Sequence, residues 1–480
     1  MDGRLTLAAL AIAFLAWIGV LIGTWPTYGG MNHATGIVAA CSDGVLHGEA
    51  PGLDRGEVFL GTPYFPPVPL LVAAARSTGM SWRAALRWVD LFSMFALIAA
   101  VALCVQALGG GTVALTVSLS ILLVSFPFVR ASLAGRADPL AAALSIGALA
   151  AWCHDPRRRG WTAPALAAAA CLVKATAFTV PLAVMIAAFG PGARRATGPF
   201  AARFFAALAA GVVLTMPWNG PGWYADVLYT LALAPPNTSI FLRGPFELLR
   251  YLASFAELTV AAGLAIVYLT SEWSRGRPVR PFAMAALALA MLAMTNRGSD
   301  HNHLLELTAL AVVAAGLWAE HATRREAVLG LALVLLVVTG AAWREGRSVS
   351  RSAHAPESKR GAVMAAVRAE PGPVLCEDPL VVLDAGRRAE ISDASTLRSR
   401  LGKGDARARA IVERIASGRY ALVVLNEDLA AERDHWYRDF QFGAAATNAI
   451  AERYEKVGLA DGFHLYRLKP ATAEAESAAP

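Results

Sequence analysis

Charged residues are scarce in this sequence, and their scarcity argues against an ordinary soluble enzyme. Only 16% of the 480 residues are charged, whereas 56% are hydrophobic, and the mean hydropathy is +0.47. These values are typical of proteins that cross a membrane several times. The net charge of +7 does not indicate nucleic-acid binding, because the arginines lie mostly in short loops between apolar runs, where they set membrane orientation.

Familiar catalytic motifs are also missing. The chain has no P-loop, no GxGxxG at a strand end, no GxSxG and no HExxH, so nothing points to the chemistry of those motifs. Its cysteines form no metal or redox pattern. Cys104, Cys153 and Cys171 lie in apolar runs, where small hydrophobic residues are expected. Cys41 and Cys376 would share the extracytoplasmic side, which would allow a disulfide between them.

Apolar runs fill the first 345 residues. Residues 5–24 form an uninterrupted run of about 20 residues, long enough to cross a bilayer, and no convincing cleavage site follows it. Further runs lie near 88–107, 112–129, 139–153, 161–190, 200–217, 247–271, 281–295, 303–319 and 326–343. The sequence therefore predicts a polytopic α-helical membrane protein.

The run at 161–190 is ambiguous, because it would fit one tilted helix or two short helices joined near Val173–Thr176. Two helices place the arginine-rich loops on the same side as the N-terminus, as the positive-inside rule requires. We therefore predict two helices here, about eleven spans in all, and an extracytoplasmic C-terminal domain. The arginine-rich loops are 154–160, 190–200, 272–280 and 320–326.

A long polar loop at residues 25–69 follows the first run and ends in GTPYFPP, whose prolines fix the direction of the backbone. Polar loops of this length beside a membrane helix usually serve function. We expect the membrane domain, residues 1–345, to hold this loop over a cavity. The predicted outer face also carries residues 129–138, the turn near Lys174, and residues 218–246 and 295–303.

The composition changes after about residue 345, where RSVSRSAHAPESKRG reads as a polar linker. The segments GPVLCED, PLVVLDAG and RYALVVLNED predict short buried strands, ARARAIVERIASG predicts a helix, and FHLYRLK predicts a closing strand. Residues 346–470 are therefore predicted to form a small α/β domain, followed by a disordered tail at 471–480.

Charged residues near the predicted outer ends of helices are the candidates for chemistry. Arg136 and Asp138, in GRADPLAAAL, fit either a helix N-terminus or a substrate path. Lys174 is the only lysine before Lys359 and lies within an apolar run. It could snorkel to the interface, or it could neutralise a lipid-linked phosphate.

The segment SDHNHLLEL leaves three interpretations open: a polar helix cap, hydrogen bonding to sugar hydroxyls, or a divalent cation, although the spacing matches no ligand motif. Its polar residues are Asp300, His301, Asn302, His303 and Glu306. In the loop at 25–69, acids such as Asp54 and Glu57 are either exposed loop residues or a general base. Tyr64 presents an aromatic face suited to sugars or isoprenoid chains.

Taken together, these features resemble the GT-C superfamily of integral-membrane glycosyltransferases, and most closely the bacterial protein O-mannosyltransferase and lipid A aminoarabinose transferase group. The resemblance covers roughly residues 1–345 and includes the loop ending in YFPP and the motifs GRADPLA, LVKATA and SDHNHLLEL. It implies inverting transfer of a sugar from a polyprenyl-phosphate donor to a lipid, glycan or protein acceptor. The reaction would take place on the extracytoplasmic face of a bacterial inner membrane.

The resemblance also implies roles for particular residues. A carboxylate just after the first helix acts as base in that family, whereas Asn32 and His33 stand at this place here. The candidate bases are therefore His33, Asp43, Asp54 and Glu57, unless activity has been lost. Donor-phosphate binding is assigned to Lys174, Arg136, Asp138 and Arg243, and sugar or acceptor binding to Tyr64, Asp300, His301, Asn302, His303 and Glu306.

Two other functions stay open at this point. A transporter or flippase of a lipid-linked substrate would share the apolar spans and Lys174, although the two halves show no repeat. An inactive assembly protein of the same fold would explain the missing acid near Asn32. The expected partners are a polyprenyl-phosphate-linked sugar, membrane lipids and an extracytoplasmic acceptor, with no nucleic acid. No cofactor is certain beyond a possible divalent cation.

Overall fold

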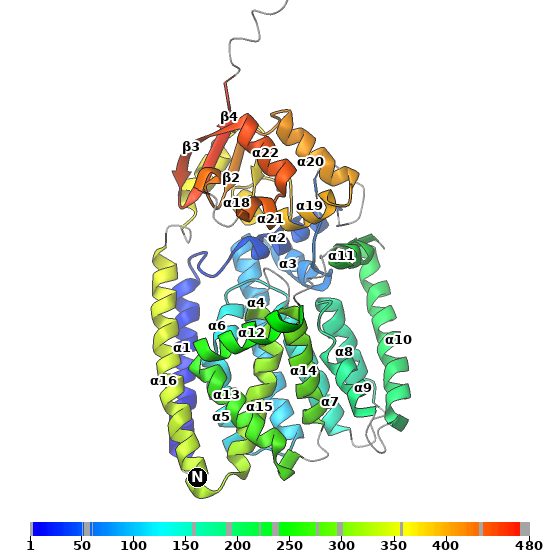
Figure 1. The fold of residues 1–480 in the computed structure, drawn as a ribbon, viewed down its shortest axis with the longest axis vertical. Coiled ribbons are helices and arrows are strands. Elements are labelled where there is room, and N and C mark those ends of the chain that lie inside the picture. Colours follow the sequence, from blue (N-terminus) through cyan, green and yellow to red (C-terminus); the bar gives the residue numbers. More distant parts are fainter. Residues whose placement is uncertain are drawn as a thin grey trace, which may run out of the picture.

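The chain forms a helical bundle with a smaller α/β layer at one end, linked by short helices between them (Figure 1). This architecture comes from a computed structural model. It describes residues 3–49, 51, 58–59, 61–155, 160–188, 194–219, 222–232, 240–274, 278–294, 301–355, 359–431 and 435–470. The predicted tail at 471–480 lies outside these residues.

Five helices in the described part of the chain are long and apolar enough to cross a membrane, or six if one bent pair forms a single span. The pair is α12 (Ile240–Ser254) and α13 (Ala256–Thr270), which meet at 112°. The predicted count of about eleven spans is therefore not confirmed. The five long helices are α1 (Gly3–Thr24), α4 (Trp82–Ala107), α10 (Arg194–Asn219), α15 (Leu305–His321) and α16 (Arg324–His354).

Shorter helices complete the bundle and pack through small residues. An added Cβ at Gly316 of α15 would collide with Ala114 of α5 (Thr112–Val124), and Ser118 donates to the Val312 carbonyl at 2.9 Å. Close backbone approach of this kind is characteristic of helices packed within a membrane. The other bundle helices are α6 (Phe126–Ala131), α7 (Asp138–His154), α8 (Thr162–Val173), α9 (Thr179–Ala188) and α14 (Val279–Ala293).

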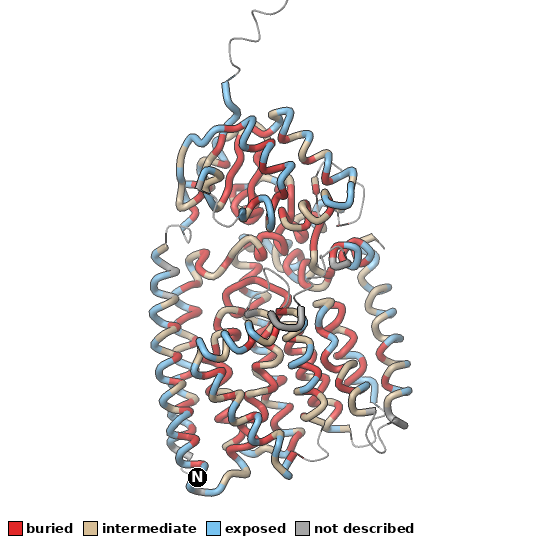
Figure 2. The backbone as a smooth tube through the Cα atoms, viewed as in Figure 1, coloured by how far each residue is buried: buried red, intermediate tan, exposed pale blue. Residues whose placement is uncertain are grey.

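Many residues of the long helices α10 and α16, at the edge of the bundle, are exposed (Figure 2), and they include large apolar residues. On α10, Phe205 and Leu214 are 64% and 69% exposed. A continuous apolar surface of this kind is expected to face lipid.

The apolar run at 161–190 forms two helices, α8 and α9, as predicted. Lys174 follows α8 in an extended conformation, with φ −144° and ψ 120°. Pro181 lies in the first turn of α9, where its missing N–H costs no helical hydrogen bond.

Short helices cover the upper end of the bundle. In the loop at 25–69, Asn32 caps α2 (His33–Leu46) through a capping box with Thr35, and Pro67 begins α3 (Pro67–Ser77). Thr35 also donates to the Ala134 carbonyl, which ties α2 to the segment before α7. The helix α11 (Gly222–Ala232) lies in the same layer.

The C-terminal part carries a four-stranded sheet of order β1-β2-β4-β3, in which β1 and β2 are parallel and the other pairs are antiparallel. Three of the four predicted strands are present, as β1 (Val374–Cys376), β2 (Leu422–Leu425) and β4 (Phe463–Leu468). The strand β3 (Tyr454–Ala460) was not predicted. The helices here are α17 (Gly361–Ala369), α18 (Pro379–Asp384), α19 (Ala394–Leu401), α20 (Ala406–Ala416), α21 (Trp436–Asp439) and α22 (Ala444–Arg453).

Two expectations for this part need correction. The segment PLVVLD is the helix α18 and not a strand, because the Asp378 carboxylate caps it and Pro379 begins it. The predicted linker is helical as far as His354, and Arg344, just before the linker, pairs with Glu257 at 2.7 Å. The domain boundary near residue 345 stays a prediction.

Cys41 and Cys376 are free thiols, so the disulfide considered between them is not formed. The two side chains are buried in separate apolar clusters. Cys41 packs with Phe65 and Trp223, whereas Cys376 packs with Val363. Each cysteine therefore acts as a small hydrophobic residue in its own cluster.

Candidate functional site

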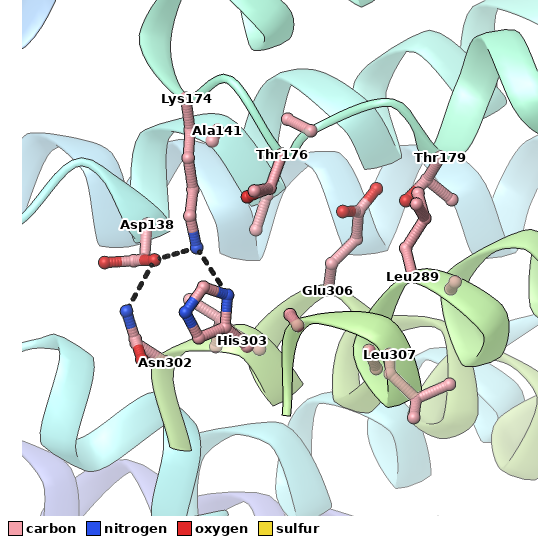
Figure 3. Close-up of a pocket in the computed structure, with 16 residues that line it drawn as sticks. Asp138, Ala141, Lys174, Thr176, Thr179, Leu289, Asn302, His303, Glu306 and Leu307 are labelled. Carbon is pink, nitrogen blue, oxygen red and sulfur yellow. Dashed lines mark hydrogen bonds and ion pairs between the residues drawn. The ribbon is translucent and has the colours of Figure 1, made fainter. Parts of the chain in front are cut away.

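A cavity of about 40 Å³ lies where the upper ends of several bundle helices meet, and Figure 3 shows the residues that line it. It is bordered by the start of α7, the connection between α8 and α9, one face of α14 and the start of α15. Its polar lining residues are Asp138, Lys174, Thr176, Thr179, Asn302, His303 and Glu306. The predicted site residues Asp138, Lys174, Asn302, His303 and Glu306 are thus brought together.

Lys174 lines one end of this cavity and is its cationic residue. Its ammonium group contacts the Asp138 carboxylate and lies 3.3 Å from His303 Nδ1. Because an ammonium group only donates, a hydrogen bond between these two groups requires His303 Nδ1 to accept. The Lys174 side chain is 18% exposed, and that of Asp138 only 2%. An ion pair this deep resists screening by salt.

Asp138 begins α7, where a carboxylate is favoured by the positive end of the helix dipole. One of its oxygens, Oδ1, receives Lys174 and the Asn302 amide, the latter at 3.1 Å. The other oxygen, Oδ2, is buried and has no hydrogen-bond partner among the described residues. Both interpretations of Asp138, helix terminus and cavity residue, therefore apply.

Arg136 lies two residues before Asp138 and is 9% exposed. Its Nε is buried and has no hydrogen-bond partner within the described ranges. The segment that carries it turns at Gly135, where φ is +62°, and Asp90 accepts from the Gly135 N–H at 2.5 Å. The left-handed conformation of Gly135 and its hydrogen bond to Asp90 together fix the direction of the backbone at Arg136.

Tyr64 belongs to the same region. Burial raises the pKa of its phenol, and the charges of Arg136 and Asp138 both act on it, the first lowering and the second raising that pKa. Its carbonyl accepts from the Trp223 indole at 2.9 Å, which connects the loop at 25–69 to α11. The predicted aromatic face of the loop therefore lies near the two charged residues.

An apolar groove of about 360 Å³ adjoins the polar cavity and runs between α12, α13, α14 and α15. Leu307 lines both the groove and the cavity. The groove was not predicted from sequence, because its lining residues have no spacing that distinguishes them from core residues. They include Leu248, Tyr251, Leu258, Ala262, Ile266, Met284, Leu287, Leu304 and Leu310.

The candidate bases lie elsewhere. His33 is the first residue of α2 and is half-buried. Asp43 lies near the end of α2, 3.4 Å from the imidazole of His47. Burial raises the pKa of Asp43, and the charges of His47 and Arg388 oppose that rise. Neither His33 nor Asp43 lines the described cavity.

Several predicted residues cannot be placed. Asp54, Glu57 and Asp300 lie outside the described residues, as do the side chains of His301 and Arg243. Within the described part of the chain, no group of three or more His, Cys, Asp or Glu residues is suited to a metal ion. The divalent cation therefore stays a prediction.

Three further residues support the site and were not predicted. Ser145 and Thr179 lie close to the Glu306 carboxylate, and Arg87 donates to the carbonyls of Leu133 and Gly29 at 2.9 and 2.7 Å. Only Arg87 could have been noticed in the sequence. It directly precedes an apolar run, where burying a charged side chain costs free energy unless the charge is paired.

The helical bundle, the layer of short helices above the buried cavity and the C-terminal α/β layer together form a fold that is similar to the folds of solved integral-membrane glycosyltransferases. The sequence itself matches no protein-family model and no curated protein. The evidence for the fold is therefore structural.

Three solved structures show this likeness. ArnT from Cupriavidus metallidurans, bound to undecaprenyl phosphate, has a TM-score of 0.66 and 14% identity, over 98% of this chain and 99% of that chain. The oligosaccharyltransferase AglB from Archaeoglobus fulgidus has a TM-score of 0.54 and 11% identity, over 97% of this chain and 75% of that chain. The mycobacterial arabinofuranosyltransferase AftD has a TM-score of 0.52 and 15% identity, over 98% of this chain and 40% of that chain. Identities this low establish the fold alone.

Proposed function

We propose that this protein is an integral-membrane glycosyltransferase that uses a polyprenyl-phosphate-linked sugar as donor. The observation that carries this proposal is the junction at Leu307, where the buried cavity that holds the Lys174 ammonium group meets an apolar groove. A lipid phosphate has the matching shape, with one charged group at the end of an apolar chain. Burying such a chain contributes about 25 cal/mol for each Å² of apolar surface removed from water.

Two cationic side chains are available to the donor phosphate. The Lys174 ammonium has three N–H donors, and its contacts with Asp138 and His303 use two of them. Arg136 has a buried Nε without a partner in the described residues. Both groups would stabilise the negative charge that grows on the phosphate as it leaves, which is an effective form of electrostatic catalysis.

The solved structures support the donor class. ArnT was crystallised with undecaprenyl phosphate, and AglB with a dolichol phosphate and an inhibitory peptide. By analogy we propose a lipid, glycan or protein acceptor on the extracytoplasmic face of a bacterial inner membrane. The proposed topology keeps about eleven spans, with shorter helices completing the long ones, and places residues 346–470 over the site.

The proposed reaction inverts the anomeric carbon. The acceptor oxygen attacks this carbon, the bond from the carbon to the phosphate oxygen breaks, and the polyprenyl phosphate leaves with the electron pair. A base takes the acceptor proton. Residues of the loop at 25–69 are the candidates, and His33, Asp43, Asp54 and Glu57 all stay open.

The experiment is a transfer assay with purified protein, radiolabelled undecaprenyl-phosphate sugars and a membrane extract as acceptor. We expect the wild type to transfer at least one sugar, and Lys174→Met to lower the rate by about 100-fold or more, because it removes charge stabilisation. One of His33→Ala, Asp43→Asn, Asp54→Asn and Glu57→Gln should lower it by about 100- to 10,000-fold and so identify the base.

Lys403→Met is the matched control, since Lys403 is exposed in the C-terminal part. It should transfer at the wild-type rate. A folded wild type that transfers no sugar, but moves a lipid-linked sugar across vesicles, would replace this proposal with the transporter function. A folded protein that does neither would favour the assembly role.

A further inference from the structure

Two buried charged residues of α4 have no part in the proposed reaction. Arg87 and Asp90 lie about one turn apart on that helix, and they are 2% and 1% exposed. Neither residue lines the described cavity. Burying a charged side chain in a membrane helix costs free energy unless other groups pair with it. The groups that pair with Arg87 and Asp90 therefore indicate what the two residues do.

Their partners are backbone groups of the short segment between α6 and α7. The Arg87 guanidinium donates to the Leu133 carbonyl at 2.9 Å. The Asp90 carboxylate accepts from the Gly135 N–H at 2.5 Å, and the Arg136 N–H also donates to it. Buried backbone groups outside a helix need partners from elsewhere in the fold. Here α4, a helix of 26 residues, supplies them and so holds the segment against a rigid element.

Arg87 also joins this segment to the loop at 25–69. One terminal nitrogen of its guanidinium donates to the Leu133 carbonyl and the other to the Gly29 carbonyl, the latter at 2.7 Å. The two stretches of backbone are in close contact, since a Cβ on Gly30, where φ is +83°, would lie 2.5 Å from the Leu133 side chain. The loop that carries the candidate bases and the segment before α7 are therefore fixed relative to each other.

The position of this segment decides where the Arg136 guanidinium lies. Arg136 is two residues before Asp138, which begins α7 and whose carboxylate contacts the Lys174 ammonium group. Arg136 lies near enough to Asp138 for their charges to interact. Recognition of a phosphate requires the charged groups around it to be held in one geometry. A shift of the segment would therefore move Arg136 away from the proposed phosphate site.

We infer that Arg87 and Asp90 are positioning residues for donor binding: acting through the backbone of residues 133–136, they hold the Arg136 guanidinium where it reaches the donor phosphate. This inference rests on the proposed function. It differs from an effect of charge, because loss of the Asp90 carboxyl group removes no positive charge and cannot by charge alone weaken the binding of an anion.

The test is equilibrium binding of radiolabelled undecaprenyl phosphate to purified full-length variants. Asp90→Leu removes the acceptor of the backbone N–H groups. Arg87→Lys keeps the positive charge but loses the planar fork whose two nitrogens reach separate carbonyls. We expect each variant to bind about 10-fold more weakly than the wild type, the loss expected when a hydrogen bond from a charged group is misplaced. Asp90→Asn keeps an acceptor oxygen and should restore most of the affinity.

Met94→Ala is the matched control for a loss of stability. Met94 is a buried core residue about one turn beyond Asp90 on the same helix. Its truncation should lower the melting temperature, because it leaves a cavity in the core, without changing the affinity for undecaprenyl phosphate. Equal losses of affinity in Met94→Ala and Asp90→Leu would assign Asp90 a purely structural role and overturn the inference.

A double-mutant cycle with Arg136→Met shows whether the two residues act through Arg136. Arg136→Met alone should weaken binding by about 10- to 100-fold. Adding Asp90→Leu or Arg87→Lys to it should cause little further loss, because the group that they position is already absent. Arg87→Lys carries the same test if Asp90→Leu does not fold.

Three results separate this inference from the proposed function. Wild-type affinity in folded Asp90→Leu and Arg87→Lys proteins would overturn the inference while leaving the proposed function intact. Fully additive losses with Arg136→Met would do the same. A folded wild type that binds no undecaprenyl phosphate would contradict the proposed function, and the inference with it.

Discussion

The ammonium group of Lys174 lies between a carboxylate and an imidazole because the chain leaves the helical conformation at that residue. The sequence made Lys174 conspicuous, since no other lysine occurs before Lys359. Its partners were harder to predict. Asp138 and His303 lie far from it in sequence, and only the packing of α7 and α15 brings them within contact distance.

Ser145 and Thr179 show what the sequence could not reveal about the site. Small hydroxyl residues are common in membrane helices, where they often bond to the preceding turn of their own helix. Nothing in their spacing distinguishes a residue that contacts Glu306 from one of these. Their significance depends on Glu306, which reaches them only through tertiary packing.

Glu377, at the end of β1, carries a prediction about pH. Burial raises the pKa of its carboxyl, while hydrogen bonds from the Asn426 N–H at 2.9 Å and the Tyr437 hydroxyl at 2.8 Å, and the charge of His33, oppose the rise. The folded-state pKa therefore lies above the unfolded value of about 4.5. The folded state then binds this proton more tightly than the unfolded state.

The stability that Glu377 contributes is thus greatest below pH 4.5 and declines as the pH rises through the raised pKa. Thermal unfolding of the purified protein should show this decline in the wild type and a flatter profile in Glu377→Gln. The difference should be a few degrees, since 1 kcal/mol moves Tm by about 2–4 °C in a domain of this size. Glu413→Gln, at an exposed position, should keep the wild-type profile, and parallel profiles for all three proteins would contradict the account.

At the scale of elements, the positions of arginines in the loops predicted the helices better than the hydrophobic pattern of short segments did. The positive-inside rule divided residues 161–190 into α8 and α9, because one long helix would have moved later arginine loops to the wrong side. The pattern of PLVVLD misled, since a short apolar run fits a buried strand or a buried helix equally well. The capping carboxylate of Asp378 decided between them.

The C-terminal layer is joined to the upper helices by a buried ion pair. Arg400 of α19 contacts the Asp226 carboxylate of α11 at 2.6 Å, and their side chains are 2% and 4% exposed. Asp405 also pairs with Arg400, at 3.1 Å. Removing one member of such a pair leaves a buried charge without its partner.

Arg400→Met should lower the free energy of unfolding by about 3 kcal/mol. The loss should concentrate at α11 and α19, where hydrogen–deuterium exchange would become faster. Asp226→Asn combined with Arg400→Met should recover part of the loss, because the most deeply buried carboxylate that Arg400 pairs with is then neutral. Arg409→Met, at an exposed position on α20, is the control. Unchanged exchange in α11 and α19 would show that the pair does not hold the two layers together.

At the scale of the whole molecule, the C-terminal part covers one end of the helical bundle. The contact is close: a Cβ on Gly36 of α2 would lie 2.6 Å from Asp378 Oδ1, next to the first turn of α18. Arg388 and Glu49 form a second ion pair across the same boundary. The composition predicted both parts, but their docking surface could not be predicted, because it depends on glycine and charge positions that have no common pattern.

The central claim is that the cavity at Lys174 holds the phosphate of a lipid-linked donor. Binding of radiolabelled undecaprenyl phosphate to wild type, Lys174→Met and Lys403→Met, each purified in detergent, tests it most directly. We predict measurable binding to the wild type and to Lys403→Met, and about 10- to 100-fold weaker binding to Lys174→Met, as expected for loss of a charge-assisted hydrogen bond. Equal binding by a correctly folded Lys174→Met protein would contradict the claim.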